Sequence, residues 1–108
     1  MTVHKVILAE YTNNDLLDIY CYIALEDSFE SADKLIKQIK DACYSLSKLP
    51  NRGHVPHEFA QLAVSNYLEI HCNEYRIIYE VVGKMVYVYC IIHMKRDVHD
   101  LLTERLLR

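Results

Sequence analysis

The sequence has few glycines and prolines, and this scarcity excludes some classes of protein. Only two residues of each type occur among 108, while hydrophobic residues make up 52% of the chain. Disordered and low-complexity chains are poor in apolar residues and rich in glycine, proline or charge. The composition therefore excludes such a chain, and the length predicts one domain, spanning residues 1–108, with a modest hydrophobic core.

Long hydrophobic runs are also missing. No apolar stretch reaches the roughly 20 residues that a membrane-spanning helix needs. The first residues, Met1-Thr2-Val3-His4-Lys5, lack the apolar stretch and cleavage site of a signal peptide. We therefore expect a cytoplasmic protein that has no membrane partner.

The cysteines lack the Cys-x-x-Cys spacing of redox and zinc motifs. Cys21, Cys43, Cys72 and Cys90 are well separated, and each stands in an apolar neighbourhood. Reduced cysteines behave as small hydrophobic residues in protein cores. We predict four reduced core cysteines, without disulfides or zinc ligation.

An excess of positive charge is absent as well. The formal net charge is −3, and neither residues 1–66 nor residues 67–108 carry more Lys and Arg than Asp and Glu. The chain therefore lacks the broad basic surface that drives binding to a phosphate backbone. A small basic patch remains open at Arg76, Lys95 and Arg96.

The hydrophobic pattern predicts two helices after a first strand at Val3 to Ala9. Thr12-x-x-Asp15 resembles an N-capping box, and apolar residues then recur at helical spacing to about Glu26. Ser28 is a suitable N-cap for the second helix, which must end before Pro50. The short link between the two helices predicts an antiparallel helical hairpin.

Three β-rich segments follow at Tyr67–Cys72, Tyr75–Val82 and Met85–His93. The gaps Asn73-Glu74 and Gly83-Lys84 leave room only for tight turns, so we predict an antiparallel meander. Its strands are apolar on both faces, which indicates that the helical hairpin packs on one face and that the other is partly covered. The predicted fold class is α+β, in the order β-α-α-β-β-β-α.

A last helix follows the third segment of the meander. Asp97 is placed to cap it, and Leu101, Leu102, Leu106 and Leu107 are candidates for packing against the sheet.

Three motifs lie on particular elements of this fold: Leu49-Pro-Asn-Arg-Gly53 after the hairpin, Tyr75-Arg-Ile-Ile-Tyr79 in the middle strand of the meander, and His93-Met-Lys-Arg-Asp97 after its last strand. Together with the element order, they resemble the RelE/ParE superfamily, the toxins of bacterial type II toxin–antitoxin systems. The resemblance extends from the first strand to Leu107. It implies the RelE/ParE-like toxin fold and no cofactor or metal.

The resemblance implies one of two activities. RelE-like members are ribosome-dependent mRNA endoribonucleases, and in this chain Arg76, His93, Lys95 and Arg96 would be their catalytic residues. ParE-like members are not nucleases and inhibit DNA gyrase. A degenerate member that binds an antitoxin without toxic activity is a third hypothesis.

Two features favour the ParE-like hypothesis. The run from His93 through Arg96 and Asp97 into Leu101-Leu102 and Arg105-Leu106 resembles the ParE pattern more closely than the RelE one. Leu68 stands where the family's arginine is expected, which weakens a phosphate site and leaves open whether toxicity is retained. We therefore expect a growth-inhibiting toxin directed at gyrase, and ribosomes or mRNA as partners only under the RelE-like hypothesis.

The resemblance also implies a cognate antitoxin partner whose C-terminal segment folds along the toxin. The predicted partner-binding residues are Arg76, His93, Lys95, Arg96 and Arg105. For Arg76 an alternative stays open, in which it is a structural residue paired with Glu69 or Glu80.

Histidines and tyrosines offer no further site in the sequence. His54-x-x-His57 lacks further metal ligands at a suitable spacing, so we predict two exposed loop histidines and no metal site. Tyr75, Tyr79, Tyr87 and Tyr89 follow period two on the predicted strands, which favours core packing over base stacking.

Overall fold

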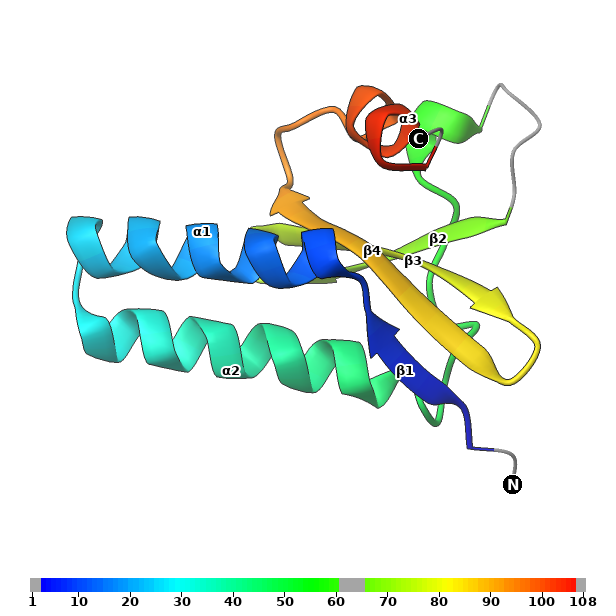
Figure 1. Cartoon of the computed structure of the whole chain (residues 1–108), viewed down its shortest axis with the longest axis horizontal. Helices are drawn as coiled ribbons and strands as arrows, with labels where there is room; N and C mark the ends of the chain where they lie inside the picture. Colours follow the sequence, from blue (N-terminus) through cyan, green and yellow to red (C-terminus); the bar gives the residue numbers. More distant parts are fainter. Residues whose placement is uncertain (1–2, 61–65, 107–108) are drawn as a thin grey trace.

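The computed structural model describes residues 3–60 and 66–106 and has the predicted element order (Figure 1). The elements are β1 (Lys5–Leu8), α1 (Glu10–Glu26), α2 (Phe29–Ser45), the short 3-10 helix η1 (His57–Phe59), β2 (Tyr67–Cys72), β3 (Tyr75–Val82), β4 (Met85–His93) and α3 (His99–Leu106). The predicted α+β fold class is thereby confirmed.

The four strands form one mixed sheet in the order β1-β4-β3-β2. Strands β2, β3 and β4 make the predicted antiparallel meander, and their bounds coincide with the predicted ones. The two turns contain Asn73 and Gly83 with φ of 55° and 60°, the left-handed region that tight hairpin turns require. Strand β1 is shorter than predicted and pairs in parallel with β4, from Lys5 opposite Met85 to Leu8 opposite Val88.

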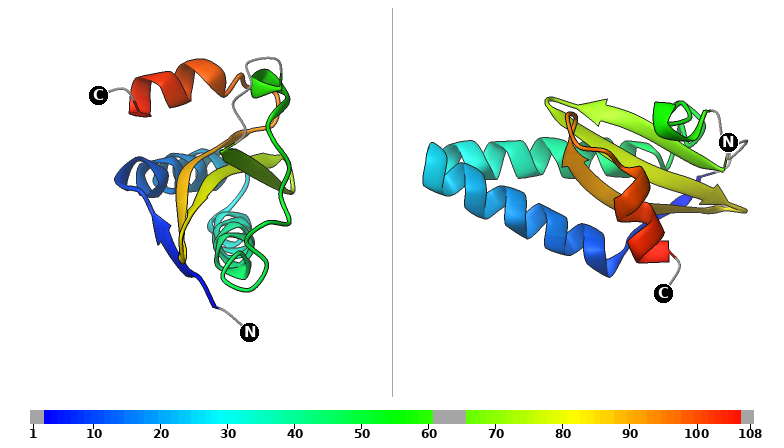
Figure 2. Two further views of the ribbon diagram at one scale, coloured as in Figure 1. Left: turned by 90° about the vertical axis from the view of Figure 1, so that its right-hand side faces the viewer. Right: turned by 90° about the horizontal axis from the view of Figure 1, so that it is seen from above.

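The helices α1 and α2 lie side by side and cover one face of the sheet (Figures 1 and 2). The Ser28 side chain accepts a hydrogen bond from the N–H of Ser31 at 3.0 Å, which confirms the predicted cap of α2. The buried residues of this hairpin-side core are Leu16, Ile19, Ile39, Cys43, Leu46, Ile70, Tyr75, Ile77, Tyr79, Val86, Val88 and Ile91.

The predicted capping box at Thr12 is wrong. Helix α1 begins at Glu10, and its N-cap position, Ala9, makes no side-chain capping bond. Thr12 lies fully buried inside the helix, where its hydroxyl donates to the carbonyl oxygen of Val88 at 2.7 Å. The hydroxyl therefore ties α1 to β4, a long-range role that sequence spacing does not reveal.

The short helices α3 and η1 cover the opposite face of the sheet (Figure 2). This α3-side core buries Phe59, Ile78, Cys90, Ile92, Val98 and Leu102, with Leu101 packed partly buried against it. The Asp97 carboxylate accepts the N–H of His99 at 2.7 Å, as expected of a residue that caps α3. The predicted packing of Leu106 and Leu107 lies outside the described side chains.

A bulge in β4 changes which of its side chains face each core. Ile78 pairs with Cys90 and Tyr79 with Val88, so Tyr89 is an extra residue on β4. Before the bulge Val88 faces the hairpin-side core, and after it Ile91 does so. The Tyr89 hydroxyl donates to Glu80 at 2.8 Å.

The turn after α2 is fastened to β3 by one tyrosine. The Tyr79 hydroxyl donates to the carbonyl oxygen of Pro50 at 2.7 Å and accepts the N–H of Gly53 at 3.0 Å. A Cβ atom at Gly53 would lie 2.6 Å from this hydroxyl and 2.7 Å from the Glu69 carbonyl oxygen. Glycine is therefore required at position 53 for the close approach of the turn to the sheet.

All four cysteines are unpaired, but one lies outside the core. Burial raises the pKa of the Cys43 and Cys90 thiols to about 12, so both stay protonated and inert at neutral pH. Cys72 is partly buried, whereas Cys21 is exposed. The prediction that Cys21 is a core residue is wrong, because the apolar neighbours in sequence turn to other sides of α1.

Within residues 3–60 and 66–106, every helix is too short or too polar to cross a bilayer.

Candidate functional site

The side chain of Arg76 is enclosed on the α3 side of the sheet and is only 2% exposed. Its Nη1 and Nη2 donate to the two carboxylate oxygens of Glu58 at 2.7 and 2.6 Å. Its Nε donates to Glu69 at 2.7 Å, and Nη1 also donates to the Arg96 carbonyl oxygen at 3.0 Å. Four of the five guanidinium N–H groups are therefore engaged within the protein.

The structure contains one of the two salt bridges that the sequence left open for Arg76. Glu69 is paired with it, whereas Glu80 accepts hydrogen bonds from Asn66 and Tyr89 instead. The bidentate partner, Glu58, was not predicted, because the connection between α2 and β2 carries no pattern that places it. Arg76 is therefore too enclosed to form an exposed basic patch with Lys95 and Arg96.

The Arg76 and Glu58 pair is strongly ionised. Hydrogen bonding to Arg76 lowers the pKa of Glu58 to about 2, with a further contribution from the Val98 N–H, which donates to it at 2.9 Å. Glu58 and then Glu69 raise the pKa of Arg76 above its ordinary value. The pair thus holds η1 and the start of α3 against the sheet.

A second ion pair covers the edge of β4 beyond the end of β1. Arg105 of α3 donates to both carboxylate oxygens of Asp15 at 2.6 and 2.8 Å and to the Tyr89 carbonyl oxygen at 2.9 Å. Asp15 also accepts the N–H of Ile91 at 3.0 Å. The guanidinium lies 5.3 Å from the centre of the Tyr11 ring, and its pKa is raised chiefly by Asp15.

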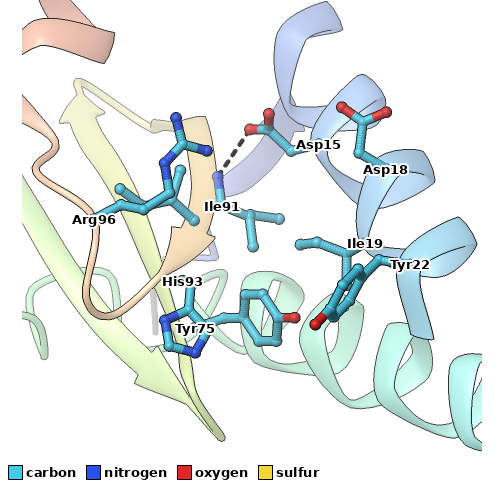
Figure 3. Close-up of a pocket in the computed structure, with 9 residues that line it drawn as sticks. Asp15, Asp18, Ile19, Tyr22, Tyr75, Ile91, His93 and Arg96 are labelled. Carbon is cyan, nitrogen blue, oxygen red and sulfur yellow. Dashed lines mark hydrogen bonds between the residues drawn. The ribbon is translucent and has the colours of Figure 1, made fainter. Parts of the chain in front are cut away.

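Next to this edge, a recess of about 360 Å³ lies between α1 and the end of β4 (Figure 3). Figure 3 shows Ile19 and Tyr22 of α1 facing Tyr75 and Ile91 of the sheet. We call this hollow the β4-edge recess. Its lining residues are Asp15, Asp18, Ile19, Tyr22, Tyr75, Ile91, Ile92, His93 and Arg96.

His93 lies at the rim of the β4-edge recess. Its Nδ1 accepts the N–H of Lys95 at 3.2 Å, so the proton of the neutral ring is on Nε2, which lies 3.6 Å from a Glu74 carboxylate oxygen. The ring packs edge-on against Tyr75, with centroids 5.7 Å apart. The His93 ring is therefore held from two sides, by the turn at Lys95 and by Tyr75 of β3.

The predicted site residues fall into two groups. His93 and Arg96 meet at the β4-edge recess, and Lys95 is exposed in the turn between them. Arg76 and Arg105 instead belong to the two ion pairs, and Leu68 packs partly buried against the hairpin-side core. The structure therefore brings two of the five predicted partner-binding residues together in a recess.

Sequence reasoning missed the α1 side of this recess. Asp15, Asp18, Ile19 and Tyr22 recur at three- and four-residue spacing, which places them on one face of a helix. That mixed acidic and apolar stripe was a usable signal. The recess combines an apolar floor with acidic groups on α1 and a basic group at Arg96, which suits a peptide with apolar and charged side chains.

Comparisons with known proteins identify the family and similar folds. Residues 6–98 match the family model described as the ParE toxin of the type II toxin–antitoxin system parDE. The fold is similar to a structure titled as a chromosomal ParDE system of P. aeruginosa, with a TM-score of 0.73, 16% identity and coverage of 88% of this chain and 100% of that one.

A second similar structure is titled as the RelBE2 toxin–antitoxin complex of Mycobacterium tuberculosis. The match has a TM-score of 0.60 and 15% identity, and it covers 86% of this chain and 93% of that one. At these identities the two structures establish the fold. No curated protein matches the chain.

Proposed function

The chain belongs to the family of ParE toxins of type II toxin–antitoxin systems, and from this membership we propose that it inhibits DNA gyrase and is neutralised by a cognate antitoxin. The main observation that favours gyrase over mRNA as the proposed target is that Arg76 is enclosed between Glu58 and Glu69.

RNA cleavage needs cations that are free to stabilise the charge developing on a phosphate. Arg76 is buried, and the carboxylates of Glu58 and Glu69 already neutralise it. A phosphate would have to displace both carboxylates and compete with their negative charge. Of the nuclease residues that the resemblance implies, His93, Lys95 and Arg96 remain, which is a small set for that chemistry.

The proposed antitoxin contact is the β4-edge recess together with Lys95. His93 and Arg96 offer hydrogen bonds and positive charge at its rim. The exposed ring of Tyr22 offers apolar surface beside the buried floor of Ile19, Tyr75 and Ile91. In this proposal the antitoxin segment is apolar with acidic side chains that meet Lys95 and Arg96. Arg76 and Arg105 act as positioning residues, since they fix the turn and helix around the recess.

The test is to induce the chain without an antitoxin and to measure two outcomes in the same cells. We expect growth inhibition, gyrase–DNA cleavage complexes and mRNA that is intact by primer extension. Codon-periodic mRNA cuts with normal gyrase activity would establish the RelE-like alternative instead. Normal growth would establish the degenerate, non-toxic member.

The contact surface is tested with Arg96→Ala. The Arg96 side chain is exposed, and only its backbone carbonyl binds Arg76, so the fold should be preserved. Loss of one charge-assisted contact should weaken antitoxin affinity about tenfold or more. Lys84→Ala is the matched control, since it removes one exposed positive charge at the far end of β4. Equal affinities of the two variants would exclude this surface.

A further inference from the structure

A cluster of two histidines and a glutamate lies on the α3 side of the sheet, apart from the β4-edge recess. Glu69 and His71 are on β2, and His54 is on the connection that leads from α2. An isolated antiparallel bridge holds His54 beside Glu69, with backbone hydrogen bonds of 3.1 and 2.7 Å in the two directions. Backbone pairing thus brings together residues that sequence spacing left apart.

The side chains of the cluster converge on one carboxylate oxygen. Glu69 Oε1 lies 3.0 Å from His54 Nε2 and 3.2 Å from His71 Nε2. All three atoms lie within 4.8 Å of one another. Ligand atoms of a tetrahedral zinc ion, at bond lengths of about 2.0–2.2 Å, are about 3.3 Å apart. Small rotations of the two rings would therefore bring all three atoms into bonding range of one ion.

The carboxylate is fixed before any ion arrives. Its other oxygen, Oε2, accepts Arg76 Nε at 2.7 Å, and the Glu69 side chain is only 4% exposed. Partners of this kind orient ligating carboxylates and raise metal affinity. The rings are open to solvent, with His54 62% and His71 46% exposed, so an ion has a path to the site.

We propose that His54, Glu69 and His71 form a binding site for a divalent transition-metal ion, with zinc as the ion best suited to this donor set. Two imidazoles and one carboxylate are a known zinc ligand combination, and they leave a fourth position for water or an outside ligand. The bound ion joins the connection at His54 to the edge strand β2. Each ring then presents the Nε2 lone pair to the ion and carries its proton on Nδ1.

A simpler arrangement competes with this proposal. Both rings donate Nε2–H to Glu69, and the cluster is only a hydrogen-bonded polar network. The two arrangements differ in one measurable respect, which is binding of metal at a stoichiometry of one ion per chain through His54 and His71.

The experiment titrates Co²⁺ and Zn²⁺ into tag-free, metal-stripped protein. Cobalt absorption in the visible range reports coordination by protein ligands, and competition with a chromophoric chelator reports zinc affinity. We expect one ion per chain for the natural sequence. His54→Gln and His71→Gln should each weaken the affinity at least about tenfold, because each removes a ligand.

The matched control is His57→Gln. His57 is a neighbouring histidine that is 83% exposed and lies outside the cluster, so this variant should bind as the natural sequence does. Circular dichroism of each metal-free variant checks that the fold is kept. The proposal is overturned if the natural protein binds no ion at micromolar concentrations, or if both cluster variants bind as tightly as the control.

Discussion

At the scale of single residues, Arg76 has a role for which lysine would be a poor substitute. Its planar guanidinium meets Glu58 with two parallel hydrogen bonds and Glu69 with a third. Lysine has no such fork. Arg76→Ala would leave two buried carboxylates without their cation, and breaking such a pair costs about 3–5 kcal/mol. That variant therefore reports on folding rather than on toxicity.

The ion pair between Glu58 and Arg76 should make the stability of the protein fall at low pH. The folded-state pKa of Glu58, about 2, lies below the ordinary value of 4.5. Its stabilising effect is therefore complete above about pH 5 and is lost as the pH falls to 2. The size of the shift corresponds to about 3 kcal/mol in the free energy of unfolding.

Urea unfolding between pH 7 and pH 2 measures this effect. Glu58→Gln should be less stable than the natural sequence at pH 7 and should lose less stability between pH 5 and pH 2. Glu26→Gln, at an exposed position near the end of α1, is the control and should follow the natural sequence. An unchanged acid dependence in Glu58→Gln would show that other carboxylates cause the loss.

The limits of sequence reasoning are also clearest for particular residues. Glu69 was a possible partner of Arg76 because both lie on adjacent strands, and the meander was predictable. Glu58 could not be predicted as a partner of Arg76, since it lies in a connection with no periodic hydrophobic pattern. The cluster proposed to bind metal could not be predicted from the sequence for a related reason. Glu69 and His71, which lie beside His54, come from a strand whose pairing with the connection was unknown.

At the scale of elements, the helix α3 is held by a contact that spans 90 residues of sequence, between Arg105 and Asp15. Both side chains are nearly enclosed, at 13% and 12% exposure. Asp15 also accepts the Ile91 N–H on the edge of β4 opposite β3, beyond the residues that pair with β1. One carboxylate thus joins α1, α3 and the edge of β4.

Asp15→Ala should loosen α3 and expose the β4 edge. We expect a loss of about 2 kcal/mol in the free energy of unfolding, since hydrogen bonds to charged groups are worth about 1.5–3 kcal/mol. The Ile91 amide should exchange with solvent faster, as measured by nuclear magnetic resonance. Asp18→Ala is the control, an exposed acidic residue one turn further along α1. Unaltered protection of Ile91 in Asp15→Ala would refute the proposed role.

The strands show which element bounds can be predicted from the sequence. The bounds of β2, β3 and β4 followed from the β-rich segments and two-residue turns, because both signals are local. The start of α1 could not be predicted in this way. The spacing from Thr12 to Asp15 matches that of an N-capping box, but both side chains form hydrogen bonds with β4 instead. A residue with a long-range partner cannot be distinguished from a cap by local sequence.

At the scale of the whole molecule, the two faces of the sheet carry unequal cores. Among the side chains that the structure describes, the hairpin-side core has twelve buried residues and the α3-side core has six. Helix α3 has 8 residues, whereas α1 and α2 have 17 each. A small core under a short helix opens at lower free energy than the rest of a domain.

We therefore expect amides of α3 to exchange more than about tenfold faster than those of the central turns of α1 and α2. Hydrogen–deuterium exchange with mass spectrometry measures both regions in one experiment. Leu102→Ala should speed exchange in α3 further and leave the central turns of α1 unchanged. Equal rates in all three helices would mean that the domain opens as one unit.

The bulge at Tyr89 marks the position at which β4 can lose one residue during evolution without rebuilding either core. Val88 faces the hairpin-side core and Cys90 faces the α3-side core, so deleting the extra residue between them would leave a strand of regular alternation, with Ile91 still toward the helical hairpin and Ile92 still toward α3. Relatives that lack the bulge should therefore keep the same residues in both cores. An alignment of relatives should place its one-residue gap at this position before any residue role is transferred across it.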